Sequence, residues 1–88
     1  MTGRVGATPE QLDHLAQEFA TKKDELQSLY ATITRQLEGT DWEGQAREKF
    51  VADWKGPFTQ AIRNIEEGLM ACGAEARDRA AKFRAAGY

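Results

Sequence analysis

The residues that could support chemistry are few in this 88-residue chain. His14 is the only histidine, and Glu10 and Glu18 lie one helical turn on either side of it, so a metal ion could be drawn in. One imidazole and two flexible carboxylates make a poor site, so we interpret them as surface groups. Cys72 is the only cysteine and cannot form an intrachain disulfide. We interpret it as a small buried apolar residue, with an intermolecular disulfide as the less favoured alternative, and predict no metal and no cofactor.

Basic residues gather near the end of the chain, where they could indicate a nucleic-acid or lipid surface. The cluster comprises Arg77, Arg79, Lys82 and Arg84. Glu75 and Asp78 dilute it, and the net charge of the whole chain is −2. Cations at the end of a helix also complement the helix dipole. We favour this structural interpretation and predict no nucleic-acid partner.

The first helix is predicted over residues 9–38. Thr8, Pro9 and Gln11 form a helix start with a capping box, and Gly39 stands where a left-handed cap would end the helix. Apolar residues recur at steps of three and four, as in an amphipathic helix. The principal ones are Leu12, Leu15, Phe19, Leu26, Leu29, Ile33 and Leu37.

Two lysines interrupt this apolar pattern. Lys22 and Lys23 stand between Phe19 and Leu26, where the next apolar step is expected. In the favoured interpretation, the lysine stems lie along the seam while their charges reach water. In the alternative, a lysine pairs with a carboxylate of a partner and sets the register.

The second helix is predicted over about 44–85, after a turn at 39–44. Thr40 and Glu43 could form a capping box, although a start at Gly44 is also compatible with the sequence. We expect a kink near 56–57, because Pro57 removes a backbone donor, with the apolar stripe continuing in phase. That stripe includes Phe50, Trp54, Phe58, Ile65 and Leu69.

A short turn makes the two helices antiparallel, so the predicted fold is an all-α helix-turn-helix hairpin. On this geometry the first helix covers the second only to about Gly73, and later residues overhang. A chain of this size buries only about 60% of its unfolded surface, so we expect a partner to share in its stability. A two-helix hairpin encloses no pocket for catalysis, so we predict no catalytic residues and no enzyme.

The pattern Trp42-x-Gly44-x-Ala46, with Phe50 and Trp54 at further steps of four, carries a family resemblance over nearly the whole chain. It resembles the WXG family of early-secreted-antigen-like proteins, the small helical substrates of bacterial type VII (ESX) secretion systems. The resemblance implies a hairpin that pairs, as a homodimer or a heterodimer, into an elongated four-helix bundle. Consistent with this, residues 1–6 lack a signal-peptide pattern, and no apolar run approaches about 18 residues. We expect export from the cytoplasm without a cleavable signal peptide.

The resemblance also implies a composite export signal. A Tyr-x-x-x-Asp/Glu motif in the tail of one subunit lies beside the Trp-x-Gly turn of the other, and an FtsK/SpoIIIE-type ATPase reads both. Here Tyr30 is followed four residues later by Thr34, and Tyr88 is the last residue, so the motif is absent. We therefore expect a heterodimer to which this chain contributes Trp42 and Gly44. A homodimer and a membrane-active secreted effector are the alternatives.

We expect Gly44 to permit close approach of the helices and Trp42 to cap the open end of the seam. The residues expected in helix packing or in the dimer interface are Leu12, Leu15, Phe19, Leu26, Leu29, Ile33, Leu37, Phe50, Trp54, Phe58, Ile65 and Leu69. Periodicity alone does not divide this set between the two kinds of contact.

Overall fold

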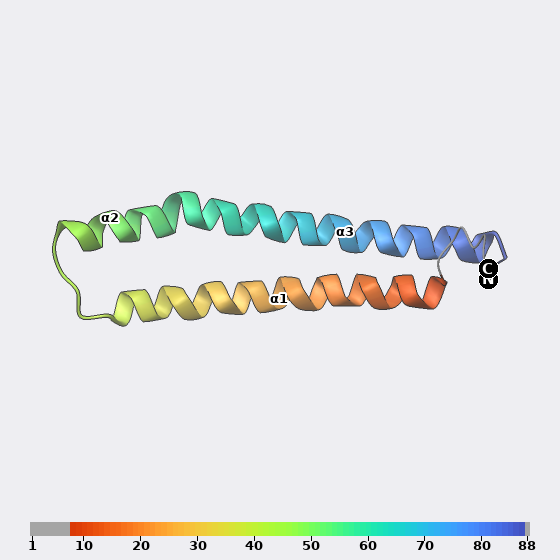
Figure 1. Cartoon of the computed structure of the whole chain (residues 1–88), viewed down its shortest axis with the longest axis horizontal. Coiled ribbons are helices and arrows are strands. Elements are labelled where there is room, and N and C mark those ends of the chain that lie inside the picture. The colour runs from red at the N-terminus through yellow and green to blue at the C-terminus, as the bar shows by residue number, and fades with distance from the viewer. Residues whose placement is uncertain (1–7, 88) are drawn as a thin grey trace, which may run out of the picture.

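The computed structural model describes residues 8–87 and consists of two long antiparallel helical arms (Figure 1). The first arm is α1 (Pro9–Gly39), and the second is formed by α2 (Gln45–Asp53), the π-helical segment η1 (Trp54–Phe58) and α3 (Thr59–Ala85). The molecule measures 63 × 23 × 18 Å. The predicted all-α antiparallel hairpin is confirmed, while the expectations for residues 1–6 and Tyr88 lie outside the described residues.

The end of α1 differs from the cap predicted at Gly39. Positive φ angles occur in the described residues only at Gly44 and Gly87, so Gly39 does not adopt the left-handed conformation. Thr40 ends the helix instead, with an extended backbone. Its N–H donates to the Leu37 carbonyl at 3.3 Å, and its hydroxyl donates to the Gln36 carbonyl at 2.6 Å. Thr40 therefore supplies two hydrogen-bond donors to carbonyls that lack a partner within the last turn of the helix.

The second arm starts at Gln45, after an extended connection, and the predicted Thr40–Glu43 capping box is wrong. Gly44 is the N-cap residue, with φ 109° and ψ −177°. Its carbonyl accepts the N–H of Glu48 at 3.1 Å, which is the first helical hydrogen bond of this arm. The threonine is not available for this start because it already caps α1.

The interruption predicted at Gly56-Pro57 takes the form of one π-helical turn, η1. Pro57 has no N–H and its ring crowds the preceding turn, so a wider turn accommodates it. The N–H of Thr59 reaches back to the carbonyl of Trp54, five residues earlier. This turn inserts one extra residue into the second arm without ending the helix.

The extra residue changes the phase of the apolar stripe, so the prediction of an unbroken phase is wrong. Trp54 is half-buried and the next inward position is Thr59, a step of five. The later inward positions again step by three and four, and they are Ile62, Glu66, Leu69, Gly73, Ala76, Ala80 and Phe83. Phe58, Ile65 and Cys72, which were expected inside the stripe, are consequently exposed.

Small residues form the closest contact between the arms. Ala16 and Ala80 have no exposed surface, and Ala76 is 5% exposed. A Cβ atom added to buried Gly73 would lie 3.5 Å from the Cβ of Phe19, so the backbones run close together here. No large side chain in the described residues is completely buried. The hairpin therefore has a thin core that relies on close backbone approach rather than on large interlocking side chains.

The expected overhang after Gly73 is wrong, because α3 remains packed on α1 almost to its end. Ala76 and Ala80 are buried, and the Arg84 guanidinium lies 2.7 Å from the Asp13 carboxylate. The late start at Gln45 and the extra residue of η1 both move later residues into the overlap. The first turns of α1 therefore lie beside the last turns of α3 (Figure 1).

The close contact predicts the effect of added bulk. Ala80→Leu should lower the free energy of unfolding by about 1–3 kcal/mol, because the larger side chain must push the arms apart. Ala81→Leu is the matched control, since Ala81 is exposed on the same helix. Urea unfolding followed by circular dichroism measures both. Equal stability of the two variants would contradict the packing described here.

Candidate functional site: the Trp42 turn and an exposed apolar face

The Trp42 side chain lies at the turn end of the hairpin and packs on α2. Its ring centroid is 5.7 Å from that of Phe50, with the two planes at 54°. Trp42 remains 37% exposed and Phe50 44% exposed. Trp42 therefore leaves much of its ring accessible at the turn, although the sequence predicted that it would cap the seam.

Gly44 has a different role from the one expected. A Cβ atom at this position would meet nothing within 4 Å, so close helix approach is not the reason for glycine. The reason is its φ of 109°, a conformation that L-residues with side chains rarely adopt. The glycine lets the extended connection turn into α2.

The turn also forms an open hollow of about 380 Å³. Its lining residues are Thr40, Asp41, Trp42, Glu43, Gly44, Arg47 and Glu48. Besides the tryptophan, the lining residues include three with carboxylates and one with a guanidinium. The hollow therefore combines an aromatic contact with several hydrogen-bonding groups, which suits an extended peptide better than a small apolar ligand.

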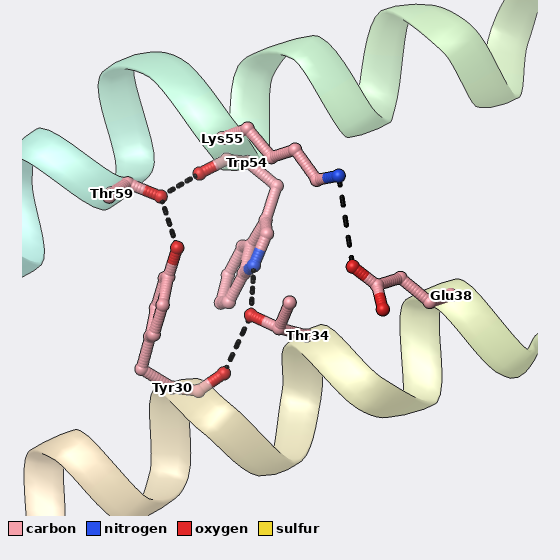
Figure 2. Close-up of polar contacts among 6 residues, drawn as sticks. All are labelled: Tyr30, Thr34, Glu38, Trp54, Lys55 and Thr59. Carbon is pink, nitrogen blue, oxygen red and sulfur yellow. Dashed lines mark hydrogen bonds and ion pairs between the residues drawn. The ribbon is translucent and has the colours of Figure 1, made fainter.

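Trp54 connects the two arms through stacking and one hydrogen bond (Figure 2). Its ring stacks on that of Tyr30 at a centroid distance of 5.5 Å and an interplanar angle of 11°. Its indole N–H donates to the Thr34 hydroxyl at 2.9 Å, and this hydroxyl donates to the Tyr30 carbonyl at 2.8 Å. The ring is thereby held in one orientation.

The hydroxyl of Thr59 closes the same network from the second arm (Figure 2). It donates to the Trp54 carbonyl at 2.5 Å, and it lies 2.8 Å from the Tyr30 hydroxyl. Because Thr59 has one hydroxyl proton, Tyr30 must be the donor to it. Beside this network, Lys55 lies 3.7 Å from Glu38. Sequence reasoning missed Thr34 and Thr59, because no periodic pattern reveals that they meet across the arms.

The twelve predicted packing residues separate into two groups. Those at or beside the contact between the arms are buried or half-buried, and they are Leu12, Phe19, Leu26, Leu37, Trp54 and Leu69. The others are 37–52% exposed, and they are Leu15, Leu29, Ile33, Phe50, Phe58 and Ile65. Half of the predicted packing residues therefore remain solvent-exposed in the single hairpin.

The exposed group lies along one side of the molecule. Leu15 and Leu29 are fourteen residues apart, and Phe58, Ile65 and Cys72 follow at steps of seven, so each series keeps to one side of its helix. Leu15 and Cys72 line the same groove, of about 390 Å³, which places the two series on the same side. We call Leu15, Leu29, Ile33, Phe50, Phe58, Ile65 and Cys72 the exposed apolar face. Cys72 was expected to be buried and is instead free and exposed.

The two lysines that interrupt the apolar pattern take different positions. Lys22 pairs with Glu25 on its own helix at 3.1 Å, and both side chains are more than half exposed. The hydrogen bond to Glu25 and the charge of this carboxylate raise the pKa of Lys22 above its ordinary value. Lys23 is half-buried and lines a separate groove with Met70 and Arg77.

Other candidate sites receive no support from side-chain positions. Within residues 8–87, no three potential metal-binding side chains gather in one place. In the same range, no helix has the length and apolar character needed to cross a membrane. The remaining features are the Trp42 turn and the exposed apolar face.

The comparison with protein families decides the family. The WXG100 family, described as proteins of 100 residues with WXG, matches residues 4–87. The chain belongs to this family. It is therefore a small WXG protein of the type VII secretion kind, from a family of helical secreted proteins that generally form dimers. Comparison with curated proteins and with solved structures gave no significant match.

The backbone of the turn predicts opposite effects at two glycines. Gly44→Ala should cost about 1–3 kcal/mol of unfolding free energy, because alanine is strained at φ 109°. Gly39→Ala should leave stability unchanged or raise it by up to about 1 kcal/mol, because Gly39 is helical with open space at its Cβ. Thermal and urea unfolding of the pair test this, and a neutral Gly44→Ala would contradict it.

The Trp54 network predicts a specific loss when its indole donor is removed. Trp54→Phe keeps an aromatic ring against Tyr30 but removes the hydrogen bond to Thr34, so unfolding free energy should fall by about 1 kcal/mol. Trp42→Phe is the control, since its indole makes no hydrogen bond within the described chain and it is 37% exposed. If both substitutions change stability equally, the hydrogen bond contributes nothing.

Proposed function

We propose that this WXG protein is a type VII secretion substrate that acts as the Trp-x-Gly subunit of a heterodimer. It stabilises a partner hairpin and is exported with it, and the partner carries the C-terminal Tyr-x-x-x-Asp/Glu signal. The observation that carries the proposal is the exposed apolar face, which the hairpin cannot cover by itself.

The elongated shape leaves more surface exposed than a compact protein of the same mass has. The chain exposes 6521 Å². A compact folded protein of 9.8 kDa exposes about 5,200 Å². The excess of about 1,300 Å² reflects the elongated shape, along which the exposed apolar face lies. A second hairpin laid along the exposed apolar face would cover part of this surface and complete an elongated four-helix bundle.

The position of Tyr30 supports assigning the tail signal to the partner. Tyr30 is held in the internal network by Trp54 and Thr59, and the residue four positions later is Thr34. Tyr30 therefore does not present a Tyr-x-x-x-Asp/Glu motif. Trp42 and Gly44 stand at the free end of the hairpin, beside a hollow that could receive an extended tail.

In this proposal the protein is cytoplasmic before export and leaves without a cleavable signal peptide. An FtsK/SpoIIIE-type ATPase recognises the pair through the partner's tail and the Trp42 turn. The protein has no catalytic role, cofactor or nucleic-acid partner. A homodimer is the alternative form of the same function, because the exposed apolar face could also receive a second copy.

Export of the Trp42 variant tests the turn. In a strain with an intact type VII system, Trp42→Ala should reduce export of this protein and of its partner while most helicity and the pairing remain. Met70→Ala is the control, since Met70 is 60% exposed and lines the separate groove described above with Lys23. Immunoblots of culture medium and cell pellet measure export. If Trp42→Ala were exported as efficiently as the wild type, the turn would have no role in export.

Co-expression tests the heterodimer. The adjacent hairpin-encoding reading frame, expressed with the tagged protein, should give a one-to-one complex in a pull-down and in light scattering. Deletion of that reading frame should abolish export of this protein. A stable dimer of the protein alone that is exported without any partner would overturn the heterodimer and establish the homodimer.

A further inference from the structure

A second groove lies between α1 and α3, on a different side of the hairpin from the exposed apolar face. It has a volume of about 330 Å³ and shares only Phe19 with the groove that Leu15 and Cys72 line. Met70 lines the second groove. Met70 and Cys72 are two residues apart on α3, so they point about 160° apart around the helix. A molecule that covers the exposed apolar face therefore does not have to cover the second groove.

The charged residues that line this groove are both cations. They are Lys23 of α1 and Arg77 of α3, and the remaining lining residues are alanine, glycine, phenylalanine, leucine and methionine. We call it the Lys23–Arg77 groove. The whole chain has 14 acidic and 12 basic residues, so a groove lined by cations without a carboxylate differs in charge from the chain as a whole.

Lys23 forms no ion pair within residues 8–87. The adjacent Lys22, in contrast, pairs with Glu25 at 3.1 Å. Glu66 is half-buried at the contact between the arms, and it is not ion-paired with Lys23 either. Lys23 is half-buried, so its stem is held at the groove while its ammonium group stays available to a carboxylate from outside the hairpin.

Arg77 differs in the same way from the cations that follow it on α3. Arg79 pairs with Glu75 at 2.8 Å, and Lys82 pairs with Asp78 at 2.9 Å. These pairs engage the two carboxylates nearest to Arg77 in the sequence, and no ion pair in the described part of the chain includes Arg77. The groove therefore presents two cations that the hairpin does not neutralise by direct contact.

The two cations stand about two helical turns apart along the groove. Gly73 lies beside Phe19, so these residues mark the same level on the two arms. Lys23 is one turn beyond Phe19 toward the connection between the arms. Arg77 is one turn beyond Gly73 in the other direction, because the arms are antiparallel. At 1.5 Å per residue, four residues on each helix give a separation of about 12 Å.

An α-helix matches this spacing. Its side chains seven or eight residues apart lie on one face with a separation of about 10–12 Å, and the side chains three or four positions along lie between them. A single-headed anionic lipid would reach only one of the two cations. A flat anionic membrane would cross the mouth of the groove without contacting its apolar lining. The positions of Lys23 and Arg77 therefore favour an acidic helix over a lipid.

We infer that the Lys23–Arg77 groove binds an acidic amphipathic helix of another protein, with carboxylates seven or eight residues apart and apolar side chains between them. One carboxylate pairs with Lys23 and the other with Arg77, while the apolar side chains contact Leu69 and Met70. The inference goes beyond the proposed function, because this groove stays available when the exposed apolar face is covered. Complementary charge and shape would select such a helix over a neutral one.

Three synthetic helical peptides of about 18 residues, built from alanine, leucine and glutamine, serve as probes. The first has two glutamates seven residues apart on one face. The second has glutamine at these positions, and the third has two glutamates nine residues apart, on opposite faces. Fluorescence anisotropy with the full-length protein should show binding of the first peptide about fivefold or more tighter than binding of either control, because only the first reaches both cations.

Variants of the protein locate the site. Lys23→Gln and Arg77→Gln should each weaken binding of the first peptide by about fivefold or more. Lys22→Gln and Arg79→Gln are the matched controls, since they remove the same charges next to the groove but do not line it. Amide chemical shifts should change around Met70 rather than around Cys72. Circular dichroism verifies that each variant remains helical.

Equal binding of the three peptides, or equal weakening by the groove variants and their controls, would overturn the inference. Absence of peptide binding would do the same. Vesicles of phosphatidylglycerol and phosphatidylcholine test the membrane directly. If the wild type binds these vesicles, Arg77→Gln does not, and no peptide binds, the groove region recognises an anionic membrane and the acidic helix is wrong.

Discussion

The extra residue in the π-helical turn determines which side chains of the second arm face α1. Without it, the step from Trp54 would lead to Phe58 and then to Ile65 and Cys72. With it, Thr59, Ile62 and Glu66 take the inward positions, and the larger apolar side chains remain outside. The network of Tyr30, Trp54 and Thr59 holds this phase, because its hydrogen bonds and ring stacking are formed at the turn itself.

The phase set at this turn explains why the hairpin is incompletely covered. The arms meet through Ala16, Gly73, Ala76 and Ala80, which permit close backbone approach but bury little apolar area per residue. Phe58 and Ile65 would contribute more area but lie on the exposed side. The isolated hairpin therefore has two unequal apolar surfaces: a close, small-residue contact within the chain and a broader face that stays exposed.

The features proposed to act in pairing and export occupy this second surface and the end of the hairpin. Trp42 packs on Phe50, the member of the exposed apolar face nearest the turn, so the turn is continuous with that face. A partner that covers the face would reach the turn at one end of the 63 Å molecule. Membership of the WXG100 family is consistent with this layout, because such proteins generally act as dimers.

The sequence was sufficient to predict the helical hairpin and the family. Apolar steps of three and four extend through both arms, and Trp42 with Gly44 stands between them, so local patterns carry this information. The apolar residues of the contact between the arms and of the exposed apolar face could also be listed from the sequence. Periodicity could not show which residue belongs to which surface. The assignment depends on the single residue that η1 adds, and Gly56-Pro57 alone does not distinguish a kink from a π-helical turn.

Several local details were likewise decided only when the arms came together. Gly44 was correctly placed at the turn, but its φ angle, not a close contact, explains the glycine. The continued packing of α3 on α1 follows from the extended connection before Gln45, which shifts every pair across the arms. Periodicity along the chain reflects each helix separately, whereas the exposed apolar face arises from the rotation of one helix against the other.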